Sequence, residues 1–110
     1  MKGFTRITSA APGFMPGEPA VAHTMTRAAY AAARDHILAL SSAAQGSCAL
    51  LGDDAKALFR AEVLGREMIA LAELDAADQP SRKARYAVRL ARARAEHAIA
   101  RERIGLISGA

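Results

Sequence analysis

A stripe of residues in the last third of the chain, apolar apart from one histidine, recurs at alternating intervals of four and three. Its members are Tyr86, Leu90, Ala93, His97, Ala100, Ile104 and Ile107. This spacing puts them on one face of an α-helix, because a helix completes a turn every ~3.6 residues. The turn sequence 78–81 contains Pro80 and precedes the pattern. Since proline is well tolerated where a helix begins, the sequence predicts a long amphipathic helix over about residues 80–107.

Two further helices are predicted upstream. Thr24 or Thr26 can cap a helix that runs to about residue 44 and stops at Gly46. Asp53 or Asp54 can cap a second one that runs to about residue 77, and both suit the positive end of its dipole. Aromatic residues make up only 5% of the chain. A sequence rich in strong helix formers and poor in strand-favouring residues is typical of an all-α protein.

The periodicity also predicts which residues are buried. For the helix over about 24–44 the buried stripe is Tyr30, Ala33, Ile37, Leu40 and Ala44, and for the helix over about 53–77 it is Ala57, Ala61, Leu64, Met68 and Leu71. In the link between them we expect Cys48, Leu50 and Leu51 to be buried. Gly65 costs ~1 kcal/mol inside a helix relative to alanine. We therefore expect another helix to approach closely there.

The short turn near residue 79 predicts that the second and third helices form a long antiparallel hairpin. The expected register brings together four pairs of opposite charge: Asp75 with Lys83, Glu73 with Arg85, Glu67 with Arg92, and Lys56 with Glu102. It also opposes Glu62 to Glu96, so the register is approximate. The fold class predicted is an all-α three-helix unit that contains this hairpin.

The first 23 residues carry five proline or glycine residues between positions 12 and 19, which exclude a continuous helix. We expect an extended N-terminal arm over 1–23 and a single helical domain over 24–110. Phe14 and Met15 lie between these breakers. They either cover the chain's own core or dock on a partner or sister subunit.

Charge is distributed unevenly along the chain. Residues 1–51 carry four basic and two acidic side chains, for a net charge of +2, and residues 52–79 carry three and seven, for −4. Residues 80–110 carry eight and two, for +6. The single cysteine, Cys48, cannot form an internal disulfide, which favours a reducing compartment. Without a run of ~20 apolar residues or a signal peptide, we expect a cytoplasmic protein, or one within a phage particle.

No residue pattern indicates catalysis. His23, His36 and His97 do not pair with another ligand at helical spacing, so no metal site is expected. His97 is expected to be half-buried in the core or an interface. The serines lack a partner base in a nucleophile motif, and no glycine-rich phosphate loop is present. We expect no enzyme, no cofactor and no small-molecule substrate.

Two hypotheses about function remain. The predicted stripe of residues 80–107 is about two turns longer than the first helix can cover. We therefore expect a homo-oligomer or a subunit of a larger bacterial or phage assembly, with Phe14, Met15, Tyr86, Leu90, His97, Ile104 and Ile107 as the contact residues. The alternative is a protein that binds nucleic acid without sequence specificity, since Arg82, Arg85, Arg89 and Arg92 form one ridge that can straddle phosphates. No aromatic side chains interleave with that ridge to stack on bases.

Overall fold

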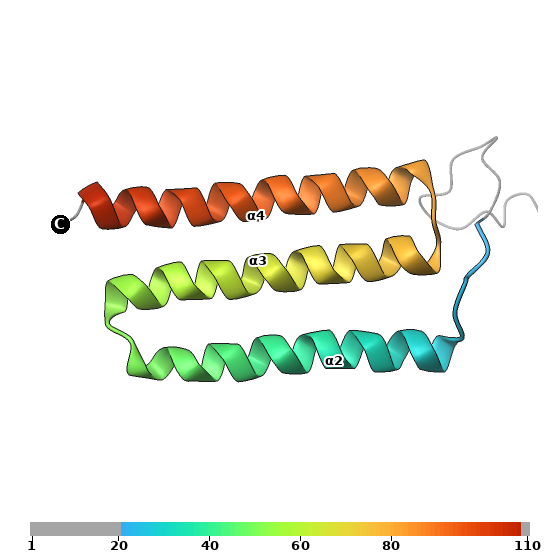
Figure 1. Ribbon diagram of the computed structural model, residues 1–110, viewed down its shortest axis with the longest axis horizontal. Helices are drawn as coiled ribbons and strands as arrows, with labels where there is room; N and C mark the ends of the chain where they lie inside the picture. The colour runs from blue at the N-terminus through green and yellow to red at the C-terminus, as the bar shows by residue number, and fades with distance from the viewer. Residues whose placement is uncertain (1–20, 109–110) are drawn as a thin grey trace, which may run out of the picture.

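The computed structural model describes residues 21–108, and that part of the chain is built of helices joined by short links (Figure 1). The α-helices are α2 (Arg27–Gly46), α3 (Asp53–Asp78) and α4 (Arg82–Ser108), and a short 3₁₀ helix, η1 (Ser47–Leu50), leads from α2 towards α3. The all-α fold with three main helices is confirmed, as is the hairpin of the last two. Phe14 and Met15 lie outside the described residues.

The helix boundaries agree closely with those predicted, but the capping differs in one place. Thr26 caps α2, and its hydroxyl accepts a hydrogen bond from the N–H of Ala29 at 3.0 Å. Ser81 caps α4 in the same way, accepting from Ala84 at 2.9 Å. The cap of α3 is Gly52, so the two aspartates that follow it lie in the first turn. There they still favour the positive end of the helix dipole.

The three helices lie side by side in one layer, in the order α2, α3, α4 (Figure 1). No Cα atom of α2 comes within 8 Å of a Cα atom of α4, so these two helices pack on α3 and not on each other. The reason lies in α3, where Val63 and Gly65 are both buried but stand about 200° apart around the helix. Opposite faces of α3 therefore pack on α2 and α4. The expectation that the first helix covers part of the third is wrong.

Gly65 marks the closest approach of α3 and α4. A Cβ atom placed on it would lie 2.9 Å from Cβ of Ala95 and 3.6 Å from its Cα. The predicted close helix contact at Gly65 is thus confirmed, and its partner is an alanine. Both helices meet through small side chains, which lets their backbones come together but buries little apolar area.

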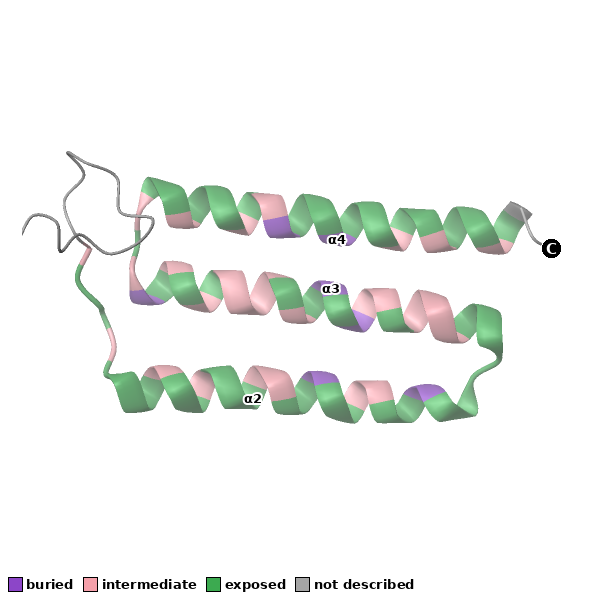
Figure 2. Ribbon diagram, turned by 180° about the vertical axis from the view of Figure 1, so that it is seen from behind, coloured by how far each residue is buried: buried purple, intermediate pink, exposed green. Residues whose placement is uncertain are grey.

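Few side chains are buried anywhere in the layer (Figure 2). The buried apolar residues are Cys48, Val63, Ala91 and Ala95, and no large side chain among those described is fully buried. Leu40, Leu50 and Leu51 are exposed, although burial was predicted for all three. In α2 the buried position is Ser41 instead of Leu40, because the contact with α3 is confined to a narrow face.

Residues 21–26, which we call the strap, tie the start of α2 to the end of α3. The N–H of Thr24 donates to the carbonyl of Asp78 at 2.7 Å, and its hydroxyl donates to the carbonyl of Ala77 at 2.6 Å. The amide of Gln79 donates to the carbonyl of Val21 at 2.7 Å. The last carbonyls of a helix lack partners within it, so the strap caps α3 from outside. This end of the predicted arm lies on its own helical domain.

No helix within residues 21–108 is both long enough and apolar enough to cross a lipid bilayer.

Candidate functional site

Helix α4 carries two stripes on opposite faces. The inner stripe, which packs on α3, consists of the buried or half-buried residues Ala84, Val88, Ala91, Ala95, Ile99, Glu102 and Leu106. The outer stripe is the set predicted from the sequence, from Tyr86 to Ile107. At about 100° per residue the two stripes stand roughly 180° apart. The predicted stripe therefore points away from the rest of the layer.

Most of the outer stripe is open to solvent. Tyr86 is 60% exposed, Ile104 62% and Ile107 78%. Leu90 is half-buried, whereas His97 is exposed. Half-burial of His97 in the chain's own core is therefore wrong, and its burial in an interface stays a prediction. The structure brings these residues together along one face of one helix. That face makes them available to contact another molecule.

A second apolar surface, which sequence reasoning missed, lies along the seam between α3 and α4. A hollow of about 370 Å³ is lined by Ala57, Arg60, Ala61, Leu64, Gly65, Met68, Ala95, Ala98 and Glu102. We call it the alanine groove, because alanines form much of its floor. Leu64 and Met68 belong to the stripe predicted to be buried on α3, yet they remain 42% and 38% exposed. The signal that could have found the groove is the run of small residues on α4 that faces Gly65.

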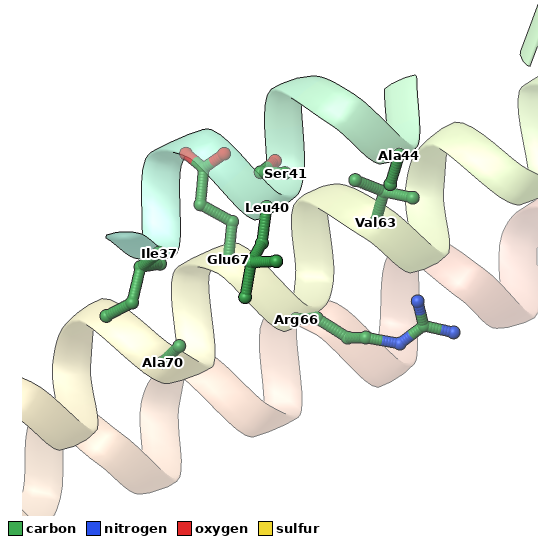
Figure 3. A pocket seen from close by; sticks show the side chains of 8 residues that line it. All are labelled: Ile37, Leu40, Ser41, Ala44, Val63, Arg66, Glu67 and Ala70. Atoms are coloured by element: carbon green, nitrogen blue, oxygen red, sulfur yellow. The ribbon is translucent and has the colours of Figure 1, made fainter. Parts of the chain in front are cut away.

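A smaller hollow of about 290 Å³ lies between α2 and α3 (Figure 3). Ile37, Leu40, Ser41 and Ala44 line it from α2, and Val63, Arg66, Glu67 and Ala70 line it from α3. Leu40 is the exposed apolar side chain at this place. The seams on both sides of α3 are thus incompletely filled.

The arginine ridge is split by the fold. Arg92 forms an ion pair with Glu73 of α3, and Arg103 pairs with Glu62 at 3.6 Å. Arg82, Arg85 and Arg89 are exposed and form no ion pair within 4.0 Å with any other residue of the described range. Three of the four predicted nucleic-acid contacts therefore carry charges that the fold does not neutralise.

None of the four ion pairs expected from the predicted register forms within residues 21–108. Arg92 pairs with Glu73 instead of Glu67, so the partner lies six residues further along α3. The cause is the position of the seam. Close packing of Gly65 on Ala95 fixes the register, and the long arginine side chains then reach along the helix to the acids that flank it.

The most strongly engaged polar group is the carboxylate of Asp78, at the last residue of α3. Arg27 donates to its two oxygens at 2.8 and 2.7 Å, His23 Nδ1 lies 2.7 Å from Oδ2, and the N–H of Met25 donates at 3.3 Å. An ionised carboxylate only accepts, so Nδ1 of His23 carries the proton. With its oxygens occupied in this way, Asp78 anchors the strap and is not a free base.

Burial raises the pKa of Asp78, but this effect is outweighed by the hydrogen bonds from Arg27, His23 and Met25 and by the charge of Arg27. Together they lower the pKa of Asp78 to about 2. The negative charge at the end of α3 opposes the helix dipole. Arg27 offsets this, and it also stacks over the ring of Tyr30 at 5.1 Å. Tyr30 donates a hydrogen bond to Asp75. This hydrogen bond raises the pKa of Tyr30, and burial and the negative charge of Asp75 raise it further.

Among the described residues, no three side chains of histidine, cysteine, aspartate or glutamate gather in a way that would hold a metal ion. In comparisons with known proteins, no family model, no curated protein and no solved structure matched this chain.

Proposed function

We propose that this chain is a non-catalytic interaction subunit that self-associates or docks on a protein partner within a larger bacterial or phage assembly, in the cytoplasm or in a phage particle. One observation carries the proposal. Eight large apolar side chains of the described range stay exposed: Leu40, Leu50, Leu51, Leu64, Met68, Tyr86, Ile104 and Ile107. Extensive exposed apolar surface marks interaction sites in soluble proteins.

The energy balance of the layer supports the same proposal. Complete burial of a leucine, isoleucine or methionine side chain contributes about 1.5–3 kcal/mol. The protomer gains little of this, because its helices meet through alanine and glycine. A second molecule laid against the layer would supply the missing burial. The enzyme hypothesis has no support from the sequence motifs.

The test is the solution mass of the purified chain, measured by light scattering after size exclusion at low and at physiological salt. We expect a defined oligomer at both, or, for docking on a different protein, a monomer that binds a dye for exposed apolar surface. A monodisperse monomer that does not bind the dye contradicts the proposal.

Nucleic-acid binding is a second candidate, favoured by the unpaired Arg82, Arg85 and Arg89. Its test is binding to duplex DNA as salt is raised from ~50 mM. Each arginine that contacts a phosphate adds about 0.9 to the slope of log affinity against log salt. We expect Arg85→Ala and Arg89→Ala each to lower the slope by about one. Arg92→Ala is the matched control, since Glu73 already neutralises Arg92. Equal slopes for all variants, or no binding at the lowest salt, contradict this candidate.

A further inference from the structure

The polar contacts that tie the strap and α2 to α3 are confined to one end of the helix pair. Within the described residues, each hydrogen bond or ion pair between the segment 21–46 and α3, or the turn after it, joins residues 21–30 to residues 75–79. The carboxylates at the centre of this set are those of Asp78 and Asp75. We call their contacts with His23, Met25, Arg27 and Tyr30 the latch.

Beyond the latch, α2 meets α3 through a narrow seam that is incompletely filled. Ser41 is the buried position of α2, and its hydroxyl accepts a hydrogen bond from Gln45 of the same helix. The hollow of about 290 Å³ takes up the middle of the seam, and Leu40, which lines it, stays exposed (Figure 3). An unfilled seam forfeits dispersion contacts along its lining. Little burial energy therefore opposes the separation of α2 from α3 once the latch is open.

The opposite seam of α3 is closed more firmly. A Cβ atom placed on Gly65 would lie 2.9 Å from Cβ of Ala95, and two ion pairs bridge α3 and α4 on either side of this contact. Since α2 and α4 do not pack on each other, α2 can leave α3 without disturbing the α3–α4 seam.

The link after α2 has the properties of a hinge. Helix η1 is attached to α2, because the N–H of Ser47 donates to the last carbonyls of α2 and the thiol of Cys48 donates to the carbonyl of Ala44. The backbone is then extended at Leu51 and Gly52. A Cβ atom placed on Gly52 would meet nothing within 4 Å beyond its chain neighbours. Rotation at these two residues is therefore unobstructed, and η1 moves together with α2.

We propose that residues 21–50 form a lid, hinged at Leu51 and Gly52, which the latch holds closed on α3. Opening turns α2 away from the α3–α4 hairpin as one piece. It exposes Val63, which lines the α2–α3 hollow and is buried in the closed form. Openings of this kind occur in units that have few buried apolar contacts. The lid is a device of the single chain, so it stands or falls independently of the proposed self-association.

Cys48 provides a probe at the end of the lid that is remote from the latch. It is buried, and the sequence contains no other cysteine. Helix α2 has 20 residues and is therefore about 30 Å long, with Arg27 at one end and Cys48 beyond the other. A chromogenic aromatic disulfide reacts with an exposed thiol. Where reclosing is faster than this reaction, the labelling rate reports the fraction of molecules that are open.

The labelling experiment compares variants on opposite sides of α3 at one protein concentration. Asp78→Asn removes the charge of the latch, and we expect it to raise the labelling rate of Cys48 at least several-fold. Gly65→Ala is the control, because it strains the α3–α4 seam, which stays intact when the lid opens, and it should leave the rate unchanged. An unchanged rate in Asp78→Asn overturns the inference, since the far end of α2 then does not follow the latch. A comparable rise in Gly65→Ala also overturns it, since the thiol is then exposed by unfolding of the whole chain.

Hydrogen exchange measured by mass spectrometry tests whether α2 opens as one piece. Asp78→Asn should speed the exchange of amides throughout Arg27–Gly46 and leave those of residues 88–99 unchanged. A rise confined to the first turn of α2 indicates local fraying and overturns the lid. Tyr30→Phe removes only the hydrogen bond to Asp75, and it replaces Asp78→Asn in both measurements should the latter fail to fold. It should give the same pattern by a smaller factor, and absence of that pattern overturns the inference.

Discussion

At the scale of single residues, Asp78 joins parts of the chain that are far apart in sequence. It accepts hydrogen bonds from side chains 51 and 55 positions away, those of Arg27 and His23. The helix cap and the periodic stripes are local patterns, so they could be predicted. The contacts of Asp78 depend on the strap passing over the end of α3, which no local pattern encodes.

The anchor makes stability depend on acid pH. The pKa of Asp78 is about 2 in the folded chain and 3.8 ordinarily, so the folded state favours its charged form. Its contribution is complete above about pH 4 and is lost as pH falls through about 2. We expect Asp78→Asn to lower the free energy of unfolding at pH 7, with the difference from wild type shrinking towards pH 2, as measured by urea unfolding. Asp35→Asn, at an exposed site on α2, is the control and should show no such pH-dependent difference.

Gly65 provides a steric prediction. Gly65→Ala would place Cβ 2.9 Å from Cβ of Ala95, too close for an ordinary contact. We expect it to destabilise the fold, although alanine is the better helix former by about 1 kcal/mol. Gly105→Ala has nothing within 4 Å and should stabilise by up to about 1 kcal/mol.

Thermal unfolding of these variants measures the contact of Gly65 with Ala95. The set also includes the double variant Gly65→Ala with Ala95→Gly. The second substitution should relieve part of the clash, so the effects of the two should not add. Strict additivity would mean that Gly65 does not pack on Ala95.

At the scale of helices, the existence and limits of α2, α3 and α4 could be predicted, because capping residues, breakers and periodicity act within a few residues. Which face of α4 packs on α3 could not be predicted. Two stripes compete on that helix, and the outer one contains the larger side chains. The inner one packs on α3 because Gly65 admits only small residues at close range. His97 and Ile104 therefore do share one face of α4, as predicted, but that face is exposed to solvent.

The register of the hairpin can be checked through its ion pair. Glu73→Lys should lower the free energy of unfolding by less than about 1 kcal/mol, because both side chains of the pair with Arg92 are about half exposed. Adding Arg92→Glu should recover most of the loss. A double-mutant cycle at low and high salt measures this coupling, which should fall as salt rises.

The matched cycle uses Glu67→Lys with Arg92→Glu, the pair that the sequence had suggested. It should show no coupling, since Glu67 lies at the α2–α3 hollow. Coupling there instead of at Glu73 would contradict the register.

At the scale of the whole molecule, the open layer connects folding with association. Under the proposed self-association, a second copy that covers the exposed apolar faces would stabilise the folded state by mass action. We expect the melting temperature to rise with protein concentration over a hundredfold range, measured by circular dichroism. A melting temperature independent of concentration in the wild type would contradict folding coupled to self-association.

The sequence by itself determined the helical class, the three helices and their ends, the close approach at Gly65 and the outer stripe as one continuous face. These depend on backbone propensity, capping and a period of 3.6, all of which are properties of neighbouring residues. Only the tertiary structure decided that α2 and α4 pack on opposite faces of α3, that Glu73 receives Arg92, that the strap closes on Asp78, and that a groove opens beside Leu64 and Met68. Each of these depends on how helices approach one another, and that geometry arises from the shapes of side chains brought together from distant parts of the chain.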